Sequence, residues 1–458
     1  GTALSELIAS GDAVGIYMEK CADAVAAFFA TVYAGGFYSV LNTELPQNRL
    51  QTTVSVLNPK VIVTSESLLE TAKEYFSERK IVTFEDLAKS EPDYAKLGQI
   101  RSHKIDTDPL YINFTSGSTG TPKGIVVCHR SVIDFIDHFT EIFGIDNNDV
   151  IANQAPFDFD VSVKDIYSSI MTGAQLVLIP KEYFSTPPRL LDYLCDKKVT
   201  NLTWAVSALT LVSALKGLNY RVPESVKRVM FSGEAMPAKQ LRIWQEKLPE
   251  AKFVNLYGPT EITCNCTYFP IERQYEDSEK IPAGKAFPGR RVILVDEEGK
   301  QVTEPGVQGE ICSAGESLAN GYYKEPEQTA EKFVLYPVDG TEQRMYRTGD
   351  LGSYDEEGNI VFAGRKDFQI KHMGHRIELG EIETAFQALD GISRVCCIYD
   401  EPNTKIIGFY VGELEAKEII ERLTERLPRF MIPNVFRQVD EMPLTKNGKI
   451  DRKCLMEE

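Results

Sequence analysis

The sequence predicts an α/β protein with a large N-terminal domain and a small C-terminal domain, and three observations support this prediction. The 458 residues exceed the length of one ordinary domain. Short apolar β runs alternate with helical patterns through much of the chain, which is typical of a mostly parallel sheet. From about Ile281, short β runs and turn signals indicate an antiparallel β subdomain.

The alternating part begins near the N-terminus. Strand-like runs at 13–17 and 60–64 flank an alanine-rich helical run at 22–33, which Gly35 and Gly36 close. Ligands in open α/β sheets bind beyond the carboxyl ends of the strands, so we expect 232–234 and 257–261 to line a common cleft. Further β runs are expected at 125–128, 174–179, 201–204, 226–231 and 253–256.

One amphipathic helix is expected after the run at 125–128. Ser131 is its predicted N-cap, and Gly144 is its predicted end. The residues that recur at helical spacing on one face predict a buried stripe: Val132, Phe135, Ile136, Phe139, Ile142 and Phe143.

The predicted domain boundary lies at residue 367. Residues 1–366 form the large domain, in which about 281–366 is the β-rich subdomain, and 367–458 form a small mobile α+β domain. The chain begins at Gly1 and not at Met, so we expect the native N-terminus to be truncated.

Composition excludes several classes of partner. Fifty Lys and Arg against 67 Asp and Glu give a net charge of −17, which disfavours nucleic acid and anionic membrane surfaces. No apolar run approaches the roughly 20 residues of a membrane span, and the start lacks signal-peptide features. The nine cysteines show no metal-ligand spacing, so we expect them to be reduced and mostly buried in a cytoplasmic protein.

The stretch from Thr115 to Gly124 is the clearest candidate for binding chemistry. It holds three glycines, five hydroxyls and Lys123, which together suit a polyphosphate. Composition alone would fit a flexible linker equally well, but the stretch lies between two apolar β runs. It is not the P-loop of kinases and GTPases, because Lys123 is followed by glycine.

Five motifs, taken in order, resemble the adenylate-forming enzymes: the acyl-CoA synthetases, the luciferases and the adenylation domains of nonribosomal peptide synthetases. The resemblance extends from about Val14 to Lys453. Residues 257–261 and 374–383 are most similar to the amino-acid-activating branch, and 153–163 also resembles D-alanine–carrier protein ligases. The five motifs are 115–124, 255–261, 346–350, 364–371 and 443–449.

The resemblance implies an ATP-dependent reaction in two steps. A carboxylate attacks the α-phosphate of ATP, which releases pyrophosphate, and the thiol of a carrier-bound phosphopantetheine then attacks the adenylate. ATP and Mg²⁺ are the implied cofactors, with Glu261 as the metal ligand and Thr260 as a phosphate contact. Lys449 is implied to bridge the substrate carboxylate and the α-phosphate region, although in isolation it would read as a solvated turn lysine.

The resemblance also implies a nucleotide site. Asp350 would accept the ribose hydroxyls, although Thr-Gly-Asp alone would indicate an Asx turn. Asn255 would read the adenine amino edge, and Asp367 would be the hinge between the domains. The remaining implied nucleotide-binding residues are Thr115, Ser116, Gly117, Ser118, Thr119 and Lys123 in the loop, Tyr257 and Phe362 beside the adenine, and Arg365 and Lys371 at the boundary.

Asp160 is implied to pair with the α-ammonium of an amino-acid substrate, because a buried carboxylate without a cation would be costly. Its neighbour Asp158 could be a surface residue. If Lys164 points inward, an acidic or strongly polar substrate, glutamate first, would satisfy it; if it points outward, alanine, serine or a small apolar residue fits as well. The other pocket positions are Val161, Thr203, Met230, Ser232, Gly233, Leu256, Cys264 and Asn265.

Three functions follow from the resemblance. The leading one is amino-acid activation and loading of a carrier protein by a nonribosomal peptide synthetase adenylation domain. The second is D-alanine activation by a carrier protein ligase. The third is a catalytically silent adenylate-binding module, against which the intact Glu261, Asp350 and Lys449 count. Asp160 makes ligation to coenzyme A less favourable.

Overall fold

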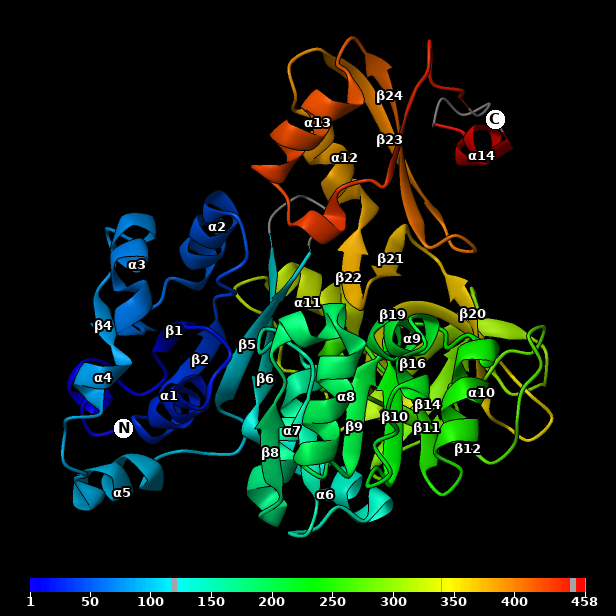
Figure 1. Ribbon diagram of the computed structural model, residues 1–458. Helices are drawn as coiled ribbons and strands as arrows, with labels where there is room; N and C mark the ends of the chain where they lie inside the picture. The colour runs from blue at the N-terminus through cyan, green and yellow to red at the C-terminus, as the bar shows by residue number, and fades with distance from the viewer. Residues whose placement is uncertain (117–121, 339, 445–449, 458) are drawn as a thin grey trace.

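The large domain contains two seven-stranded sheets and one antiparallel sheet, and the C-terminal domain stands above them in Figure 1. The structure, a computed structural model, describes residues 1–116, 122–338, 340–444 and 450–457. Mostly parallel sheets, an antiparallel subdomain and a small C-terminal α+β domain confirm the predicted fold class. None of the helices in these ranges combines the length and the apolar composition that a membrane-spanning helix requires.

The first seven-stranded sheet lies at the N-terminal side of the molecule. Its order is β17-β6-β5-β2-β1-β3-β4, and the five strands from β5 to β4 run parallel. β5 and β6 pair antiparallel, with Thr115 opposite Lys123, so the glycine-rich stretch connects two adjacent strands. The strands are β1 (Ala13–Tyr17), β2 (Phe37–Val40), β3 (Val61–Thr64), β4 (Ile81–Thr83), β5 (Pro109–Thr115), β6 (Lys123–Cys128) and β17 (Gly321–Tyr322).

The second seven-stranded sheet has the order β13-β12-β11-β10-β9-β7-β8, parallel from β11 to β8. Met230 on β10 lies between Thr203 on β9 and Val254 on β11, so these side chains share one face of the sheet. The strands are β7 (Val150–Asn153), β8 (Gln175–Leu178), β9 (Asn201–Ala205), β10 (Arg228–Ser232), β11 (Lys252–Tyr257), β12 (Thr267–Ile271) and β13 (Lys285–Ala286).

The antiparallel sheet follows in the chain, in the order β15-β14-β16-β19-β18, with β20 also paired to β19. Its strands are β14 (Arg290–Val295), β15 (Gln301–Val302), β16 (Gln308–Gly315), β18 (Phe333–Val338), β19 (Thr341–Tyr354) and β20 (Ile360–Arg365).

The C-terminal part begins with a two-stranded hairpin, β21 (Gln369–His372) and β22 (His375–Glu378). A three-stranded sheet follows: β23 (Ile392–Asp400), β24 (Lys405–Gly412) and β25 (Val435–Gln438). Apolar residues of α12 and α13 pack on one face of this sheet, and Met442, Ile450 and Leu455 pack on the other.

Helices cover the sheets as expected for crossover connections. The α-helices are α1 (Ala22–Tyr33), α2 (Gln47–Leu57), α3 (Leu69–Tyr75), α4 (Phe84–Leu87), α5 (Tyr94–Ser102), α6 (His129–Phe143), α7 (Val161–Thr172), α8 (Pro187–Asp196), α9 (Val206–Ala214), α10 (Ala238–Lys247), α11 (Pro326–Lys332), α12 (Leu379–Gln387), α13 (Ala416–Thr424) and α14 (Arg452–Glu457). Short 3₁₀ helices are η1 (Leu4–Glu6), η2 (Glu66–Leu68), η3 (Lys181–Ser185), η4 (Gly217–Asn219), η5 (Thr260–Ile262) and η6 (Arg429–Met431).

Helix α6 corrects one prediction. Its apolar stripe is buried as expected, except for the half-buried Ile142, and Gly144 ends it with a φ of 61°. Ser131 is not the N-cap, because the helix begins at His129 and Cys128 occupies the cap position. The Ser131 hydroxyl is instead buried and donates to the carbonyl of Leu318 at 2.9 Å.

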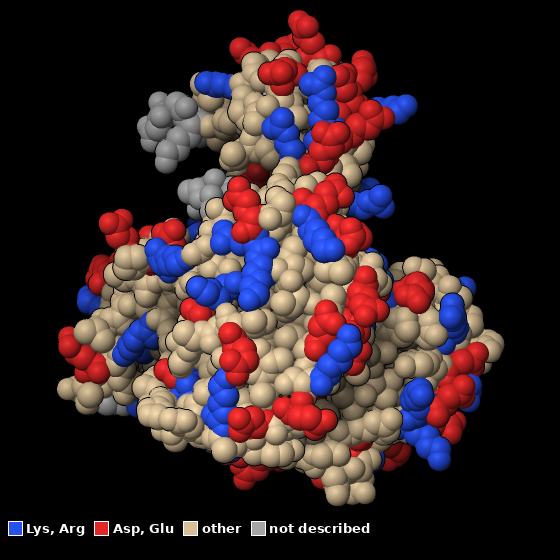
Figure 2. Space-filling model, turned by 90° about the vertical axis from the view of Figure 1, so that its left-hand side faces the viewer, with Lys and Arg blue, Asp and Glu red and all other residues tan. Residues whose placement is uncertain are grey.

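The hairpin β21–β22 lies between the large domain and the rest of the C-terminal domain (Figure 1). Figure 2 shows the C-terminal domain as a separate lobe above the large domain. The Gly374 N–H donates to Glu234 at 2.7 Å, and Arg49 on α2 forms an ion pair with Glu381 on α12. Polar contacts therefore hold this arrangement of the domains.

Candidate active site

Glu261, at the start of η5 just beyond β11, is buried, with 1% of its surface exposed. Arg376 of β22 donates from Nη1 to its two carboxylate oxygens at 2.9 and 2.7 Å, and the Tyr322 hydroxyl donates at 2.9 Å. Burial opposes ionisation of Glu261, but Arg376 and Tyr346 leave its pKa below the ordinary value. The expected metal ligand is thus an ionised carboxylate bound by a guanidinium from the other domain.

Asp350 on β19 forms the centre of the expected nucleotide site. Its carboxylate is buried, accepts from the Tyr257 hydroxyl at 2.5 Å and forms an ion pair with Arg365. Lys371 lies over the Tyr257 ring, with Nζ 5.5 Å from the centroid. Four of the residues predicted for the nucleotide therefore lie together, although they come from β11, β19, β20 and β21.

The expected adenine contacts lie beside this group. The rings of Tyr257 and Phe362 are 6.4 Å apart between centroids and inclined at 43°, so they touch and form no open parallel slot in this arrangement. The Asn255 amide donates to the carbonyl of Pro282 at 2.8 Å. That bond uses the amide nitrogen and not Oδ1, the acceptor that an adenine amino group would need.

The structure describes the two ends of the glycine-rich stretch, up to Ser116 and from Pro122. The Ser116 hydroxyl donates to the carbonyl of Arg376 at 2.9 Å and accepts from the Glu378 N–H at 3.2 Å. Lys123 lies 5.8 Å from the Tyr322 ring centroid. The other three expected loop residues lie outside the described residues: Gly117, Ser118 and Thr119.

Asp160 comes directly before α7 and near Thr260. Burial raises the pKa of its carboxyl, against the opposing influence of Lys164 and a hydrogen bond with Thr260. Over the ranges that the structure describes, Asp160 forms no ion pair. Its neighbour Asp158 is half-buried; it accepts from Asn42 at 3.0 Å, and burial raises its pKa as well.

Lys164, in the first turns of α7, points inward and is 1% exposed. Its ammonium donates to Asn265 Oδ1 at 2.7 Å, and burial lowers its pKa although Cys264, Asp160 and Asp165 act in the opposite direction. Among the described residues it has no carboxylate within ion-pair distance. A neutral amide is a weak partner for a buried ammonium.

The other predicted pocket residues surround these two side chains. Register places Thr203 beside Met230 on one sheet face, and Ser232 and Leu256 follow two residues further along β10 and β11. The Cys264 thiol lies 3.1 Å from the Asp160 carbonyl, Gly233 has a φ of 99°, and Val161 begins α7. The buried members are Thr203, Met230, Ser232, Leu256, Cys264 and Asn265.

The predicted hinge residue Asp367 lies at the edge of the site. Asp367 is exposed between β20 and β21 and accepts from the Arg365 guanidinium at 2.7 and 2.8 Å. Lys449 lies outside the described residues. The segments on either side of 445–449 pack on the β23–β24 face, at the end of the molecule away from the large domain in Figure 1.

Sequence reasoning missed Arg376 and Tyr322 as site residues. Arg376 lies within the quoted motif 374–383, but nothing in one sequence shows that it reaches Glu261, 115 residues earlier. A lone arginine in a polar motif gives no signal of its partner.

His375 gives a pH-dependent prediction. It stacks on Phe430 at 3.6 Å between ring centroids and meets Phe159 of the large domain edge-on at 5.1 Å. Burial, aided by His372 and opposed by Glu44, lowers its pKa to about 4. In the unfolded chain His375 takes up a proton near pH 6.5, whereas in the folded protein it does so only near pH 4. The contribution of neutral His375 to the free energy of unfolding is therefore full above pH 6.5 and is lost as the pH falls toward 4.

We expect the free energy of unfolding, measured with urea, to fall by roughly 1 to 2 kcal/mol more in the wild type than in His375→Phe between pH 7 and pH 5. Equal losses in both proteins would contradict this assignment.

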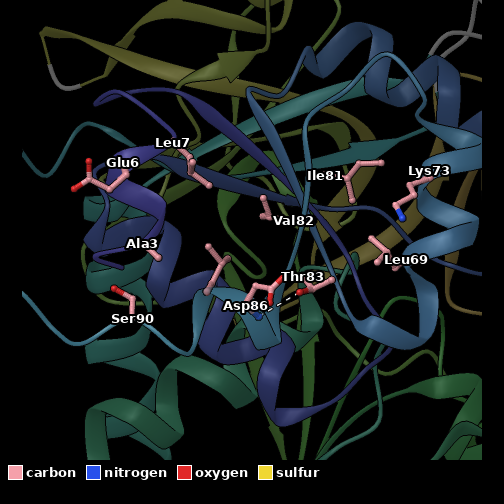
Figure 3. A pocket seen from close by; sticks show the side chains of 11 residues that line it. Ala3, Glu6, Leu7, Leu69, Lys73, Ile81, Val82, Thr83, Asp86 and Ser90 are labelled. Carbon is pink, nitrogen blue, oxygen red and sulfur yellow. Dashed lines mark hydrogen bonds between the residues drawn. The ribbon is translucent and has the colours of Figure 1, made fainter.

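A cavity of about 540 Å³ lies elsewhere, between η1, α3, α4 and the β4 edge (Figure 3). Its charged lining residues already have partners in the chain: Glu6 pairs with Lys96, Lys73 with Glu70, and Asp86 with Lys89. Thr83 caps α4 by accepting from the Asp86 N–H. None of the predicted site residues lines it, so we assign it no chemistry.

Comparison with known proteins agrees with this geometry. Residues 2–323 match the family model described as AMP-binding enzyme, and residues 381–449 match the AMP-binding enzyme C-terminal domain. The chain belongs to the AMP-binding enzyme family, whose members form adenylates. This confirms the resemblance stated from the motifs.

Among curated proteins, the chain is 34% identical to surfactin synthase subunit 1 of Bacillus subtilis (strain 168) over 451 residues, which is 97% of this chain and 12% of that protein. It is 33% identical to zwittermicin A synthase ZmaJ of Bacillus cereus over 454 residues, 96% of this chain and 84% of the relative. Relatives are often much longer: the chain spans 12%, 8% and 40% of three curated synthases.

Two solved structures show the same fold. The structure described as holo-PA1221, an NRPS protein containing adenylation and PCP domains, matches with a TM-score of 0.84 at 24% identity, over 99% of this chain and 78% of that one. The structure described as holo-AB3403, a four-domain nonribosomal peptide synthetase bound to AMP and glycine, matches with a TM-score of 0.70 at 28% identity, over 99% of this chain and 33% of that one.

Proposed function

We propose that this protein activates an amino acid as aminoacyl-AMP with release of pyrophosphate and then transfers it to a carrier-protein phosphopantetheine thiol. The observation that carries the proposal is Asp160: a half-buried carboxylate without an ion pair in the described residues, beside the expected metal and nucleotide residues. An α-ammonium would supply the missing cation. Plain carboxylic acids and coenzyme A ligation fit this feature less well.

The expected nucleotide residues support the ATP half of the proposal. Asp350 can accept from the ribose hydroxyls, since each carboxylate oxygen has a second lone pair beyond its bond to Tyr257 or Arg365. Lys371 adds a cation beside the ring of Tyr257. Lys449 is proposed, from its motif alone, to neutralise the negative charge that develops at the α-phosphate.

The carboxylate of Glu261 fits Mg²⁺, because proteins usually bind this ion through one or two carboxylates together with the phosphates of a nucleotide. The ion would neutralise the phosphate oxygens when bound. In this arrangement of domains, both Glu261 oxygens are engaged by Arg376, so Glu261 fits the ion once the guanidinium withdraws.

The side chain of the substrate is proposed to be acidic, with glutamate as the first candidate. Lys164 points into the pocket, and a buried ammonium whose described partner is an amide would gain from a carboxylate. Alanine, including the D-alanine of the carrier-ligase alternative, would leave this ammonium uncompensated.

The carrier step is supported by the related structure described as a four-domain nonribosomal peptide synthetase bound to AMP and glycine, and by the relatives named surfactin synthase and zwittermicin A synthase. ATP–pyrophosphate exchange across the proteinogenic amino acids and D-alanine tests the first step. Transfer of the radiolabelled amino acid to a holo carrier protein, followed by mass spectrometry, tests the second. No exchange with any amino acid would contradict the proposal.

Lys449→Ala is expected to lower pyrophosphate exchange by about 100-fold or more while ATP binding, measured by calorimetry, stays within a few fold. The reason is that one cation aimed at developing charge contributes about this much to a transition state. Lys446→Ala, in the same motif, is the matched control. A loss of less than about tenfold in Lys449→Ala would favour the catalytically silent binding module.

A further inference from the structure

Strand β19 leaves the regular ladder of the antiparallel sheet at the point where it carries Asp350. The register between β16 and β19 skips here, so that residues 348–350 lie opposite Ile311 alone. Such a bulge bends its strand and turns the side chains that it carries in a new direction. The conformation of the bulge 348–350 therefore decides where the Asp350 carboxylate lies.

Side chains make the hydrogen bonds that hold this bulge. The Glu310 carboxylate on β16 accepts from the Gly349 N–H at 3.0 Å through Oε1. The Thr348 hydroxyl donates to the carbonyl of Ile311 at 2.7 Å and accepts from the Asp350 N–H at 2.9 Å. Glu310 is the charged member of this group, and it bonds the residue directly before Asp350.

Gly349 packs closely against the nucleotide site. Its φ is 75°, and a side chain at this position would place its Cβ 3.0 Å from Arg365 Nη2 and 3.2 Å from Asp367 Oδ2. Arg365 is also the ion-pair partner of Asp350. A rotation of the Gly349 peptide would therefore move Asp350 relative to Arg365, and the hydrogen bond from Glu310 resists that rotation.

Glu310 is itself held as an anion. It is 4% exposed, and its Oε2 accepts from Arg347 Nη2 at 2.6 Å and from Lys366 Nζ at 3.3 Å. Burial opposes ionisation of Glu310, but Arg347, the Gly349 N–H and Lys366 leave its pKa below the ordinary value. A hydrogen bond to an ionised acceptor is roughly twice as strong as one between neutral groups. One oxygen of this carboxylate thus holds the bulge, and the other is bound by two cations.

We propose that Glu310 is a positioning residue for the nucleotide: by holding the bulge 348–350, it fixes the Asp350 carboxylate where it can accept from the ribose hydroxyls. The inference rests on the proposed function, which assigns the ribose to Asp350. Glu310 acts through the Gly349 peptide and does not touch the nucleotide. Its effect is on the choice between ribonucleotides and deoxyribonucleotides.

The preference for ATP over 2′-deoxy-ATP measures this role. The kcat/KM of pyrophosphate exchange is determined with each nucleotide, and the ratio of the two values is the preference. We expect the wild type to prefer ATP by about tenfold or more, because 2′-deoxy-ATP lacks a hydroxyl that donates to a charged acceptor. Asp350→Asn should remove most of this preference.

Glu310→Gln is expected to lower the preference to about threefold or less, chiefly through a higher KM for ATP. The glutamine is a weaker acceptor for the Gly349 N–H, and its amide group faces the two cations. A variant that only lost stability would lower the rates with both nucleotides alike and would keep the wild-type ratio.

Asp355→Asn is the matched control. Asp355 holds the turn at the other end of the β19–β20 pair by accepting from the N–H groups of Glu357 and Asn359 at 3.0 and 2.8 Å. It is a turn-holding carboxylate next to the same two strands, but it does not bond the bulge. We expect this variant to keep the wild-type nucleotide preference.

Arg347→Gln serves where Glu310→Gln does not fold. The Arg347 side chain is 42% exposed, so its loss leaves the core intact, but it frees Oε2 of Glu310 from its strongest partner. We expect the preference for ATP to fall by about two- to threefold. A wild-type preference in folded Glu310→Gln would overturn the inference, as would a wild-type preference in Arg347→Gln where the first variant does not fold.

The inference and the proposed function can fail separately. Absence of exchange in the wild type with either nucleotide would overturn the proposed function. Exchange without a preference for ATP would overturn the assignment of the ribose to Asp350, and the role of Glu310 with it. A wild-type preference that Asp350→Asn removes and Glu310→Gln keeps would overturn only the role of Glu310.

Discussion

Asp160→Asn lowers amino-acid-dependent pyrophosphate exchange by about 100-fold or more, as the expected result of losing the substrate's counter-ion. The α-ammonium would be left in a buried site without a charge partner, which costs about 3 to 5 kcal/mol, and each 1.4 kcal/mol is a factor of ten. The affinity for ATP alone should stay within a few fold, because Asp350, Tyr257 and Arg365 are untouched.

Asp158→Asn is the control for this change. Asp158 lies two residues earlier and is half-buried, with a raised pKa, but it already accepts from Asn42. The asparagine would keep an acceptor for that bond, so we expect exchange within about threefold of the wild type. If Asp160→Asn behaved like Asp158→Asn, Asp160 would not bind the substrate.

Lys164→Met is the second change with a large expected effect. Exchange with glutamate should fall by about 100-fold, since the substrate carboxylate would enter a buried pocket without its cation. Exchange with a neutral residue of similar length, such as glutamine or methionine, should fall far less or rise. Initial rates over a panel of amino acids measure this change in preference.

The structure offers a matched control for removing a buried lysine charge. Lys20 is mostly buried, donates to the carbonyls of Asn153 and Gln154, and has a pKa lowered to about 8, chiefly by burial. Lys20→Met should lower stability without changing the substrate ranking. Wild-type activity with alanine or valine but none with glutamate or aspartate would contradict the acidic pocket.

Much of the fold could be predicted because it depends on local patterns. The sequence predicts helix α1 at its observed bounds, and β8 to β11 follow from short apolar runs. The N-cap of α6 was missed because Ser131 has the right residue type, but its hydroxyl bonds Leu318, which is 187 residues away in the chain. Local propensity gives no information about such a distant partner.

The candidate site also has a part that the sequence predicts and a part that depends on the tertiary arrangement. The resemblance of the motifs implies Asp350, Tyr257 and Glu261 as site residues, and the structure brings Asp350 and Tyr257 into a hydrogen bond. The direction of Lys164 stayed open from the sequence, since burial of one side chain in α7 depends on how that helix lies against β7 and β9. The contact between Arg376 and Glu261 depends on the arrangement of two domains and has no local signal.

Side chains on β9 and β10 of the second sheet alternate between its two faces. This alternation has a consequence for how selectivity between amino-acid substrates can change over evolution or in the laboratory. Thr203 and Met230 lie on the sheet face of the proposed pocket, whereas their neighbours Trp204 and Phe231 point to the opposite face and form a separate apolar core. Substitutions at Thr203 or Met230 therefore leave that core intact. Their effects on the free energy of unfolding should add to those of substitutions in the core. Under the proposed function, a new amino-acid preference can be acquired by changing a few side chains on one face, without rebuilding the strands that carry the proposed nucleotide site.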